Sequence, residues 1–451
     1  MTDPAADRSA ISTPVHEDDE ATVVDALEEP AEDVAAITPD ALSSPHRSRI
    51  VVVPLVVGLL FFFGPVVAVL GGDRAEEIDN RPLATMPSAS DGWSFIPRFT
   101  TWANDHLGLR SRAVRTGTDL SEAMFDEPPQ YGQASAAVGV GGNGNRASAG
   151  GVQYPEVIPG SDGWLYLGSD VSAPCKPLLS VGQIVGGLER LDAAVTASGR
   201  TLVIALVPDK STMVPQYLPD RYAGKQCAAD RKSDFWDQVT SADLPLIDMR
   251  GPLGEAQARA GSPLYRKTDS HWAMQGASVF VSQVIARLDP ALLDDGVTRF
   301  VQGPETAVPG DLGAMLGTPT TDPAVEVIVE RRGVTLSIDG QATDVDDLPE
   351  LGSGPIVIDA SSDQAPLFPG RTAILGDSFY ASARPLFTPF FDQLTMLHNQ
   401  ADAGPLAQVI VDSDTIVVEL VERSVSGGYV QLTTPAVLDV IEQQLATHPR
   451  G

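Results

Sequence analysis

The chain has 451 residues, of which 43% are hydrophobic, so it can bury a substantial core and is not disordered throughout. Its formal net charge of −30 argues against nucleic acid as a partner, because binding to phosphates requires lysine and arginine side chains on the protein. The same charge disfavours a polyanionic substrate and favours a neutral or partly cationic one, although solubility alone would also explain it.

The first 46 residues are acidic and contain no aromatic side chain. Twelve acidic residues and a single basic residue, Arg8, precede His46. Such a segment cannot bury enough apolar surface to offset the entropy of folding. Residues 1–46 are therefore expected to form a disordered acidic tail.

An uncharged apolar stretch follows from Ile50 to Gly72. At about 1.5 Å per residue, a helix of this length spans the hydrocarbon core of about 30 Å. Arginines precede the stretch and acidic residues follow it, which predicts a single transmembrane helix over residues 47–72 in the cell membrane, with the N-terminus cytoplasmic and the rest extracytoplasmic. A cleaved signal peptide would start closer to Met1. A buried core helix is the remaining alternative.

Residues 73–151 are expected to form an extracytoplasmic stem. Its last part, Ala134–Gly151, is rich in glycine and alanine and is typical of a flexible loop. The folded domain is expected at residues 152–451. Cys175 and Cys227 are the two cysteines of the chain, and a lone pair outside the cytoplasm favours a disulfide between them. Two unrelated buried thiols are the alternative.

From residue 152 onward the sequence alternates helix and strand patterns. Apolar residues between Val181 and Val195 recur at helical spacing, and Gly199 marks the end of this helix. The run Thr201–Val207 is typical of a buried parallel strand. Further strands are predicted near Ile247 and Ile358, at Thr372–Leu375, and around Val411 and Val418. This order predicts a three-layer α/β sandwich with a central, mostly parallel sheet, in which ligands bind outside the carboxyl ends of the strands.

The string Gly376-Asp377-Ser378-Phe379-Tyr380 directly follows one of these predicted strands. Small residues at a strand-to-helix turn expose the serine hydroxyl, and the first N–H groups of the helix point to the same place. This is the arrangement of a nucleophile with its own oxyanion donor. Alternatively, Ser378 merely caps a helix that begins around Phe379.

His271 is the best placed of the six histidines to act as the base for this serine. In an extended segment, Asp269 two positions earlier points to the same side. Its carboxylate can then orient the imidazole while the other ring nitrogen faces Ser378. Trp272 would shield the site or stack on a sugar ring. The alternative is a surface Asp–His pair that caps the helix predicted to follow.

No metal site and no cofactor are predicted. The chain lacks the His-x-x-x-His and Cys-x-x-Cys spacings of common metal sites. It also lacks a glycine-rich phosphate loop, because its glycine-rich stretch is of low complexity.

Taken together, these strings resemble the alginate O-acetyltransferase family of SGNH-hydrolase-like proteins, the AlgJ and AlgX type. The strings that carry the resemblance are, in order, Glu77–Leu83, Asn104–Arg110, Gly160–Leu167, Val207–Lys210, Tyr217–Pro219, Thr268–Trp272, Gly376–Phe379 and Val417–Arg423. The resemblance implies an SGNH-hydrolase-like catalytic domain with Ser378 as nucleophile, His271 as base and Asp269 as the residue that orients the base. With Asp-x-His placed before the serine, the order looks like the permuted acetyltransferase branch.

Three further residues are candidates for substrate contact, namely Asp209, Lys210 and Arg384, because they lie near a predicted strand end or near the nucleophile. Turn and helix-end contacts are the alternative for all three. His106, in contrast, is better explained as part of the stem. Because 28 residues follow Arg423, an appended carbohydrate-binding domain is not expected.

The resemblance and the predicted anchor imply an O-acetyltransferase that acetylates hydroxyls of an exported or cell-envelope polysaccharide through an acetyl-serine intermediate. Since the acetyl donor must cross the bilayer, a membrane-bound O-acyltransferase is the expected partner. The acidic charge favours a polysaccharide other than a polyuronate. The alternatives are a carbohydrate esterase with the same three residues and a non-catalytic cell-surface scaffold. The sequence does not separate transferase from esterase, because both form an acyl-enzyme.

Overall fold

The structure is a computed structural model in which the chain divides into two units, Met1–Phe62 and Phe63–Gly451. All described residues lie in the second unit, and they comprise 86–88, 95, 98, 99, 102, 106, 154–318, 320–352 and 354–450. The predicted tail, the predicted transmembrane helix and the glycine-rich loop lie outside these residues and stay predictions. Among the described helices, none combines the length and the apolar character needed to cross a bilayer.

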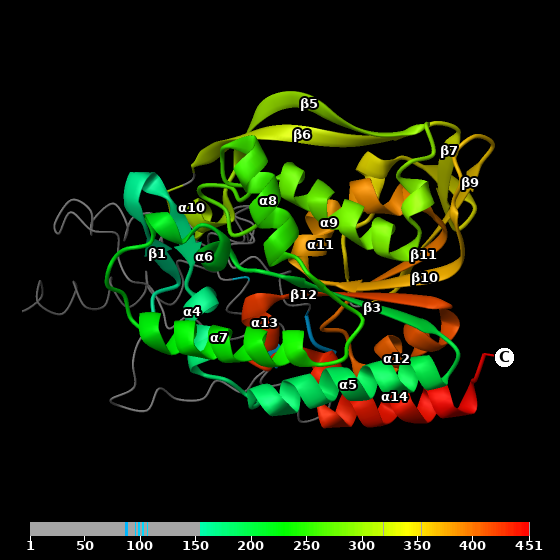
Figure 1. Cartoon of the computed structure of the whole chain (residues 1–451), viewed down its shortest axis with the longest axis horizontal. Coiled ribbons are helices and arrows are strands. Elements are labelled where there is room, and N and C mark those ends of the chain that lie inside the picture. The colour runs from blue at the N-terminus through cyan, green and yellow to red at the C-terminus, as the bar shows by residue number, and fades with distance from the viewer. Residues whose placement is uncertain are drawn as a thin grey trace, which may run out of the picture. The chain divides into compact units, whose positions relative to one another are not determined.

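A mixed sheet forms the centre of the folded unit (Figure 1). Within the described residues it has eight strands in the order β4-β3-β12-β10-β11-β9-β7-β8. The first five pair in parallel, whereas β9, β7 and β8 are antiparallel. The strands are β3 (Thr201–Val207), β4 (Leu246–Asp248), β7 (Val334–Ile338), β8 (Gln341–Thr343), β9 (Ile356–Ser362), β10 (Phe368–Gly376), β11 (Phe391–His398) and β12 (Thr415–Val421).

Helices cover both faces of this sheet, so the predicted three-layer α/β architecture is confirmed (Figure 1). One face packs against α5 (Val181–Ala197), α7 (Lys225–Ser241), α12 (Ala403–Asp412) and α14 (Pro435–Thr447). The other face packs against α8 (Arg250–Ala260), α9 (Met274–Leu288) and α11 (Ser378–Phe387). Beyond these helices lies an antiparallel ribbon of β5 (Thr298–Pro309) and β6 (Thr321–Arg331).

Several short elements gather near the carboxyl ends of the parallel strands. They are β1 (Val157–Pro159), β2 (Leu165–Leu167), α4 (Ser169–Cys175), α6 (Lys210–Met213), α10 (Asp311–Met315) and α13 (Glu422–Ser426). The α6 and α13 helices directly follow β3 and β12, and α11 directly follows β10. This is the edge of the sheet at which the sequence predicted the site.

Most of the predicted elements are confirmed. The helix predicted from Val181 is α5, and Gly199 follows it with a φ of +80°, a left-handed conformation that glycine adopts without strain. The run around Val411, however, is not a strand but the end of α12. Its buried residues include Leu406 and Ile410, which are one helical turn apart and face the sheet.

A disulfide joins Cys175 to Cys227, which confirms the predicted pairing. It links the end of α4 to the first turn of α7, and these two helices pack against each other. In the described part of the stem, the ring of His106 lies 5.0 Å from that of Trp102 and its Nδ1 lies 2.9 Å from the Trp102 carbonyl oxygen. Both of these contacts join residues of the predicted stem.

Candidate active site

Ser378 is the first residue of α11, and Asp377 alone separates it from Gly376 at the end of β10. The N-cap of the helix is Asp377, whose Oδ1 accepts a hydrogen bond of 2.9 Å from the backbone N–H of Phe379. The alternative that Ser378 caps the helix is therefore wrong. Because Asp377 satisfies the helix end, the partly buried hydroxyl of Ser378 is not needed for capping.

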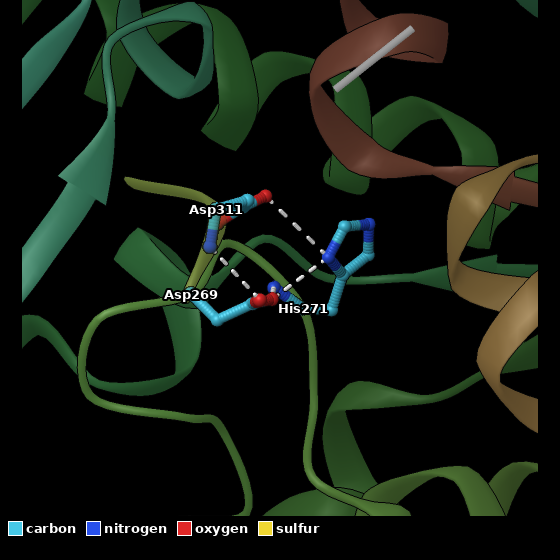
Figure 2. A group of neighbouring side chains, drawn as sticks. All are labelled: Asp269, His271 and Asp311. Carbon is cyan, nitrogen blue, oxygen red and sulfur yellow. Dashed lines mark hydrogen bonds and ion pairs between the residues drawn. The ribbon is translucent and has the colours of Figure 1, made fainter. Parts of the chain in front are cut away.

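Asp269 and His271 form the hydrogen-bonded pair that the sequence predicted (Figure 2). Nδ1 of His271 lies 2.8 Å from Oδ1 of Asp269, and the backbone N–H of His271 donates to the same oxygen at 2.9 Å. The other ring nitrogen, Nε2, is buried and accepts or donates no hydrogen bond within the described residues. A neutral imidazole that donates through Nδ1 carries its lone pair at Nε2, as a general base requires.

The pair lies on a hairpin-like turn between α8 and α9. Tyr265 and Trp272 form a bridge across the turn, and the N–H of Ala273 donates to the carbonyl of Leu264 at 2.7 Å. These backbone bonds close the segment on itself. The two side chains of the pair are thereby carried on a fixed loop.

The Asp269 carboxylate is ionised at neutral pH. Burial by itself would raise its pKa, but the hydrogen bond and charge of His271, together with the guanidinium of Arg266, lower the pKa to about 2. Arg266 donates to Oδ2, the oxygen that His271 does not use. A charged carboxylate at Nδ1 favours the tautomer with its proton on that nitrogen and would stabilise an imidazolium.

The ring of Phe379 connects this loop to the serine turn. Its centroid lies 5.0 Å from that of His271 and 5.1 Å from that of Trp272. The indole N–H of Trp272 also donates to Oγ of Ser382 on α11 at 2.7 Å. Since Ser378 directly precedes Phe379, the serine and the histidine lie on neighbouring elements. No hydrogen bond joins the two side chains in the described structure.

The Trp272 side chain is buried among aromatic rings. It is 2% exposed. One contact is the edge-on ring of Phe379, and another is Phe280 of α9, whose centroid lies 5.4 Å away. A sugar stacks on an exposed aromatic face, so of the two roles predicted for Trp272 the geometry favours shielding.

Lys210 lies inside the protein, 1% exposed, and its ammonium points at the loop that carries the Asp–His pair. Nζ donates to the carbonyl oxygens of Arg266, Lys267 and Asp269 at 2.9, 3.1 and 2.7 Å. All three donor positions of the ammonium are therefore occupied. The geometry gives Lys210 a supporting role and offers no support for the predicted contact with substrate.

Asp209 is also buried, in a cluster of ionic side chains. Its carboxylate accepts from Lys232 at 2.6 Å and from Arg423 at 3.2 Å. The guanidinium of Arg423 in turn lies over the ring of Phe379, 5.3 Å from its centroid.

The third substrate candidate, Arg384, is half-buried on α11 and donates to the carbonyl of Pro349. Structural contacts thus occupy both Asp209 and Arg384.

Two acidic residues of the site were not predicted from the sequence. Asp311, at the start of α10, lies beside the Asp–His pair (Figure 2). Glu419, on β12, is fully buried, and its Oε2 accepts from the N–H of Asp377 at 2.9 Å. Burial and the neighbouring Asp377 charge raise the pKa of Glu419 well above its usual value. A charged residue within an apolar strand was a signal for Glu419, whereas nothing local marked Asp311.

Ligand atoms of Asp269, His271 and Asp311 lie within 4.8 Å of one another, a spacing compatible with a metal ion. Each carboxylate, however, already accepts hydrogen bonds. Asp269 accepts from His271 and Arg266, and Asp311 accepts from Ser270. The arrangement is better explained as a hydrogen-bonded loop than as a set of free metal ligands.

Comparison with protein families adds an independent observation. Residues 157–351 match the family model described as SGNH hydrolase-like domain, acetyltransferase AlgX. The predicted family resemblance is confirmed. The matched segment includes Asp269, His271 and Asp311, and it ends before Ser378.

Curated relatives of this chain include proteins named Probable alginate O-acetylase AlgJ. The AlgJ of Pseudomonas syringae pv. tomato is 30% identical over 165 residues, which cover 36% of this chain and 41% of that protein. The AlgJ of Pseudomonas aeruginosa is 29% identical over 183 residues, which cover 39% and 44%. The match thus spans about two fifths of the length of these relatives.

Solved structures with a related arrangement include the O-acetyltransferase domain of Pseudomonas putida AlgJ. It has a TM-score of 0.42 and 20% identity, and the alignment covers 60% of this chain and 93% of that one. Bacillus cereus PatB1 has a TM-score of 0.42 and 14% identity, with coverages of 62% and 98%. Likeness at this level carries no information on function.

Proposed function

We propose that this chain is a membrane-anchored O-acetyltransferase that acetylates hydroxyls of an exported or cell-envelope polysaccharide through an acetyl-Ser378 intermediate. One observation carries the proposal. The imidazole of His271 is fixed through Nδ1 by Asp269, keeps a buried and unpartnered Nε2, and packs against the residue that follows Ser378. A base that is oriented and lacks a competing partner is what a serine nucleophile needs.

In the first half-reaction, Oγ of Ser378 attacks the carbonyl carbon of an acetyl ester while its proton passes to Nε2 of His271. The tetrahedral intermediate collapses, the bond to the donor oxygen breaks, and His271 returns the proton to the leaving alcohol. The product is an acetyl ester on Ser378. Asp269 stabilises the imidazolium that exists between the two proton transfers.

In the second half-reaction, a sugar hydroxyl attacks the carbonyl carbon of acetyl-Ser378 and gives its proton to His271. The Ser378 oxygen then leaves and takes this proton, which restores the enzyme. Negative charge on the carbonyl oxygen needs a donor in both steps. The N–H of Phe379 is bound to Asp377. We therefore assign the donor role to the N–H of Ser378 at the start of α11.

The predicted membrane helix determines the partner in this proposal. The acetyl donor is made in the cytoplasm, whereas the domain that follows residue 72 is expected outside. A membrane-bound O-acyltransferase would therefore carry the acetyl group across the bilayer and load Ser378. The AlgJ relatives are named for alginate, a polyuronate, but the negative charge of this chain favours a less acidic polysaccharide.

The acetyl-enzyme is tested with the detergent-solubilised full chain and p-nitrophenyl acetate. Peptide mass spectrometry should find one acetyl group on the peptide that contains Ser378. Label should be absent in Ser378→Ala and retained in the matched control Ser361→Ala, which changes an exposed serine of β9. In His271→Ala, labelling should slow by several orders of magnitude. A folded wild-type protein that acquires no label at Ser378 would overturn the proposal.

The acceptor is tested in the same assay by adding oligosaccharides. Transfer predicts that acetyl groups appear on the sugar and that turnover rises with acceptor concentration. A carbohydrate esterase would instead release acetate at a rate that acceptors leave unchanged. A non-catalytic scaffold would show no turnover, and a Ser378→Ala strain would then keep its normal polysaccharide acetylation.

A further inference from the structure

A second carboxylate stands beside the Asp–His pair. Oδ2 of Asp311 lies 3.6 Å from Nδ1 of His271, the same nitrogen that Oδ1 of Asp269 approaches to 2.8 Å. Figure 2 shows both carboxylates directed at this side of the ring. Asp311 comes from α10, 42 residues beyond Asp269, so the two acids belong to separate segments.

Asp311 is bound to the loop at more than one point. Its Oδ1 accepts from the backbone N–H of Ser270 at 2.7 Å, and its Oδ2 accepts from the Ser270 hydroxyl at 2.5 Å. The N–H of Asp311 donates to Oδ2 of Asp269 at 3.2 Å. Ser270 lies between the two members of the pair, so Asp311 holds the residue that separates them.

The backbone around Asp311 makes the same connection. The N–H groups of Leu312 and Gly313 donate to the carbonyl oxygen of Thr268 at 3.1 and 3.4 Å. A Cβ added at Gly310 would lie 2.2 Å from that carbonyl oxygen, so only glycine permits this close approach. The start of α10 is therefore packed directly onto the loop that carries His271.

The position of Asp311 gives it a second capability. Its oxygen is about 0.5 Å beyond a normal hydrogen bond to Nδ1, a gap that a small rotation of the imidazole closes. In the structure, Nδ1 is hydrogen-bonded to Asp269, and the Ser270 hydroxyl lies 3.3 Å from the same nitrogen. If the Asp269 charge were removed, Asp311 would be the remaining carboxylate beside Nδ1 among the described residues.

We infer that Asp311 is a positioning residue of the candidate site, which holds Asp269 and His271 through Ser270 and can replace Asp269 as the carboxylate partner of the imidazole. The inference rests on the proposed function for its catalytic consequence. The contact between Asp311 and the imidazole does not depend on that function, because the tautomer of His271 can be measured without turnover. If Asp311 were purely structural, it would stabilise the loop, and the tautomer of His271 would depend on Asp269 alone.

The test is a double-mutant cycle of Asp269→Asn and Asp311→Asn in the full chain. In the wild-type background, Asp311→Asn should lower kcat/KM for an acetyl ester by about tenfold or less, because Asp269 still orients the ring. In the Asp269→Asn background, the same change should cost a further factor of about a hundred. Equal factors in both backgrounds would overturn the inference.

A second readout is the ¹⁵N spectrum of histidine-labelled protein, with His271→Gln to identify the signal. In Asp269→Asn the ring should keep its proton on Nδ1, held by Asp311. In the double variant the proton should move to Nε2. This result is independent of activity, so a chain that transfers no acetyl group would still confirm or refute the role of Asp311. An unchanged tautomer in the double variant would refute it.

Asp322→Asn is the matched control. Asp322 also holds the loop, by accepting from the N–H of Thr268 at 2.7 Å, and it is not among the carboxylates paired with the imidazole. It should lower kcat/KM by the same factor in both backgrounds and leave the Asp269→Asn tautomer unchanged. If Asp311→Asn does not fold, Asp311→Ser keeps a small polar side chain as the first residue of α10 and removes the charge. The same outcomes then apply.

Discussion

At the scale of single residues, the ammonium of Lys210 explains how the Asp–His loop is held from within. It faces three carbonyl oxygens, and it also lies 5.4 and 5.2 Å from the ring centroids of Trp164 and Tyr166. Burial lowers its pKa to about 8, against the opposing attraction of nearby aspartates that include Asp170 and Asp311. The loop is therefore held by the buried ammonium of Lys210, a residue for which the sequence analysis predicted contact with substrate.

We predict that Lys210→Met destabilises the protein and impairs the site. The change removes the Lys210 donor from three loop carbonyl oxygens. That of Lys267 keeps the N–H of Leu165, and each oxygen left unpaired costs about 1–3 kcal/mol. Acetyl-ester hydrolysis should fall by at least about tenfold, because a displaced imidazole loses its alignment. Denaturant unfolding and initial rates measure the two effects. The control is Lys225→Met, an exposed lysine bound to a single carbonyl. Wild-type stability in Lys210→Met would contradict the prediction.

Glu419 is an acid buried beneath the serine turn, and its ionisation lowers the free energy of unfolding. Burial and the charge of Asp377 raise the pKa of Glu419 in the folded protein. At a pH between the ordinary pKa of glutamate and this raised pKa, the folded protein keeps a proton that the unfolded chain has released. Stability is then fullest below the unfolded pKa and declines as pH rises toward the folded one. Glu419 therefore destabilises the protein at neutral pH.

Glu419→Gln should consequently raise the melting temperature at pH 7 to 8 by about 2 °C or more. The gain should shrink as pH falls and vanish below about pH 4, where the glutamate is neutral in both states. Calorimetric scans of both proteins from acid to neutral pH measure the difference. A gain that is constant with pH would show that ionisation of Glu419 is not its cause.

At the scale of elements, the start of α11 shows what local patterns predict well. The small residues after a buried strand predicted the serine turn, and β10 and α11 confirm a strand-to-helix turn there. Hydrophobic runs alone did not distinguish the end of α12 from a strand, since three consecutive apolar residues, Val409–Val411, fit both. The mixed sequence of β11 and the largely exposed β5–β6 ribbon offered no continuous apolar pattern, and they were not predicted.

The cap of α11 gives a prediction at this scale. Asp377→Ala removes the acceptor for the Phe379 N–H and should lower the free energy of unfolding by about 1–2 kcal/mol. It should also reduce acetylation of Ser378, because the first turn of the helix positions that residue. Asp377→Asn keeps a side-chain acceptor of similar shape and should retain most of the stability. Equal losses in the two variants would indicate that the charge, and not the cap, is what matters.

At the scale of the whole molecule, the candidate site combines residues that are distant in sequence. Asp269 and His271 were predictable because they are two positions apart in one segment. Asp311 was not, since its place beside them depends on how α10 packs against the loop. The supporting role of Lys210 likewise follows from a fold that brings β3 and the α8–α9 loop together. Local spacing thus predicted the Asp–His pair, and tertiary packing added the residues that hold it.

Net charge is also a property of the whole chain, and it bears on the acceptor. From residue 50 onward, the chain has 48 acidic and 27 basic residues, so its net negative charge repels a polyuronate. Salt screens such repulsion, because the Debye length falls from about 30 Å at 0.01 M to about 8 Å at 0.15 M. We therefore predict that KM for alginate oligosaccharides falls severalfold over this range, whereas KM for a neutral glucan stays constant. Initial rates of acetyl transfer at matched pH measure both. A KM for alginate that rises with salt would instead reveal a local basic track that binds the uronates and would reverse the preference for a neutral acceptor.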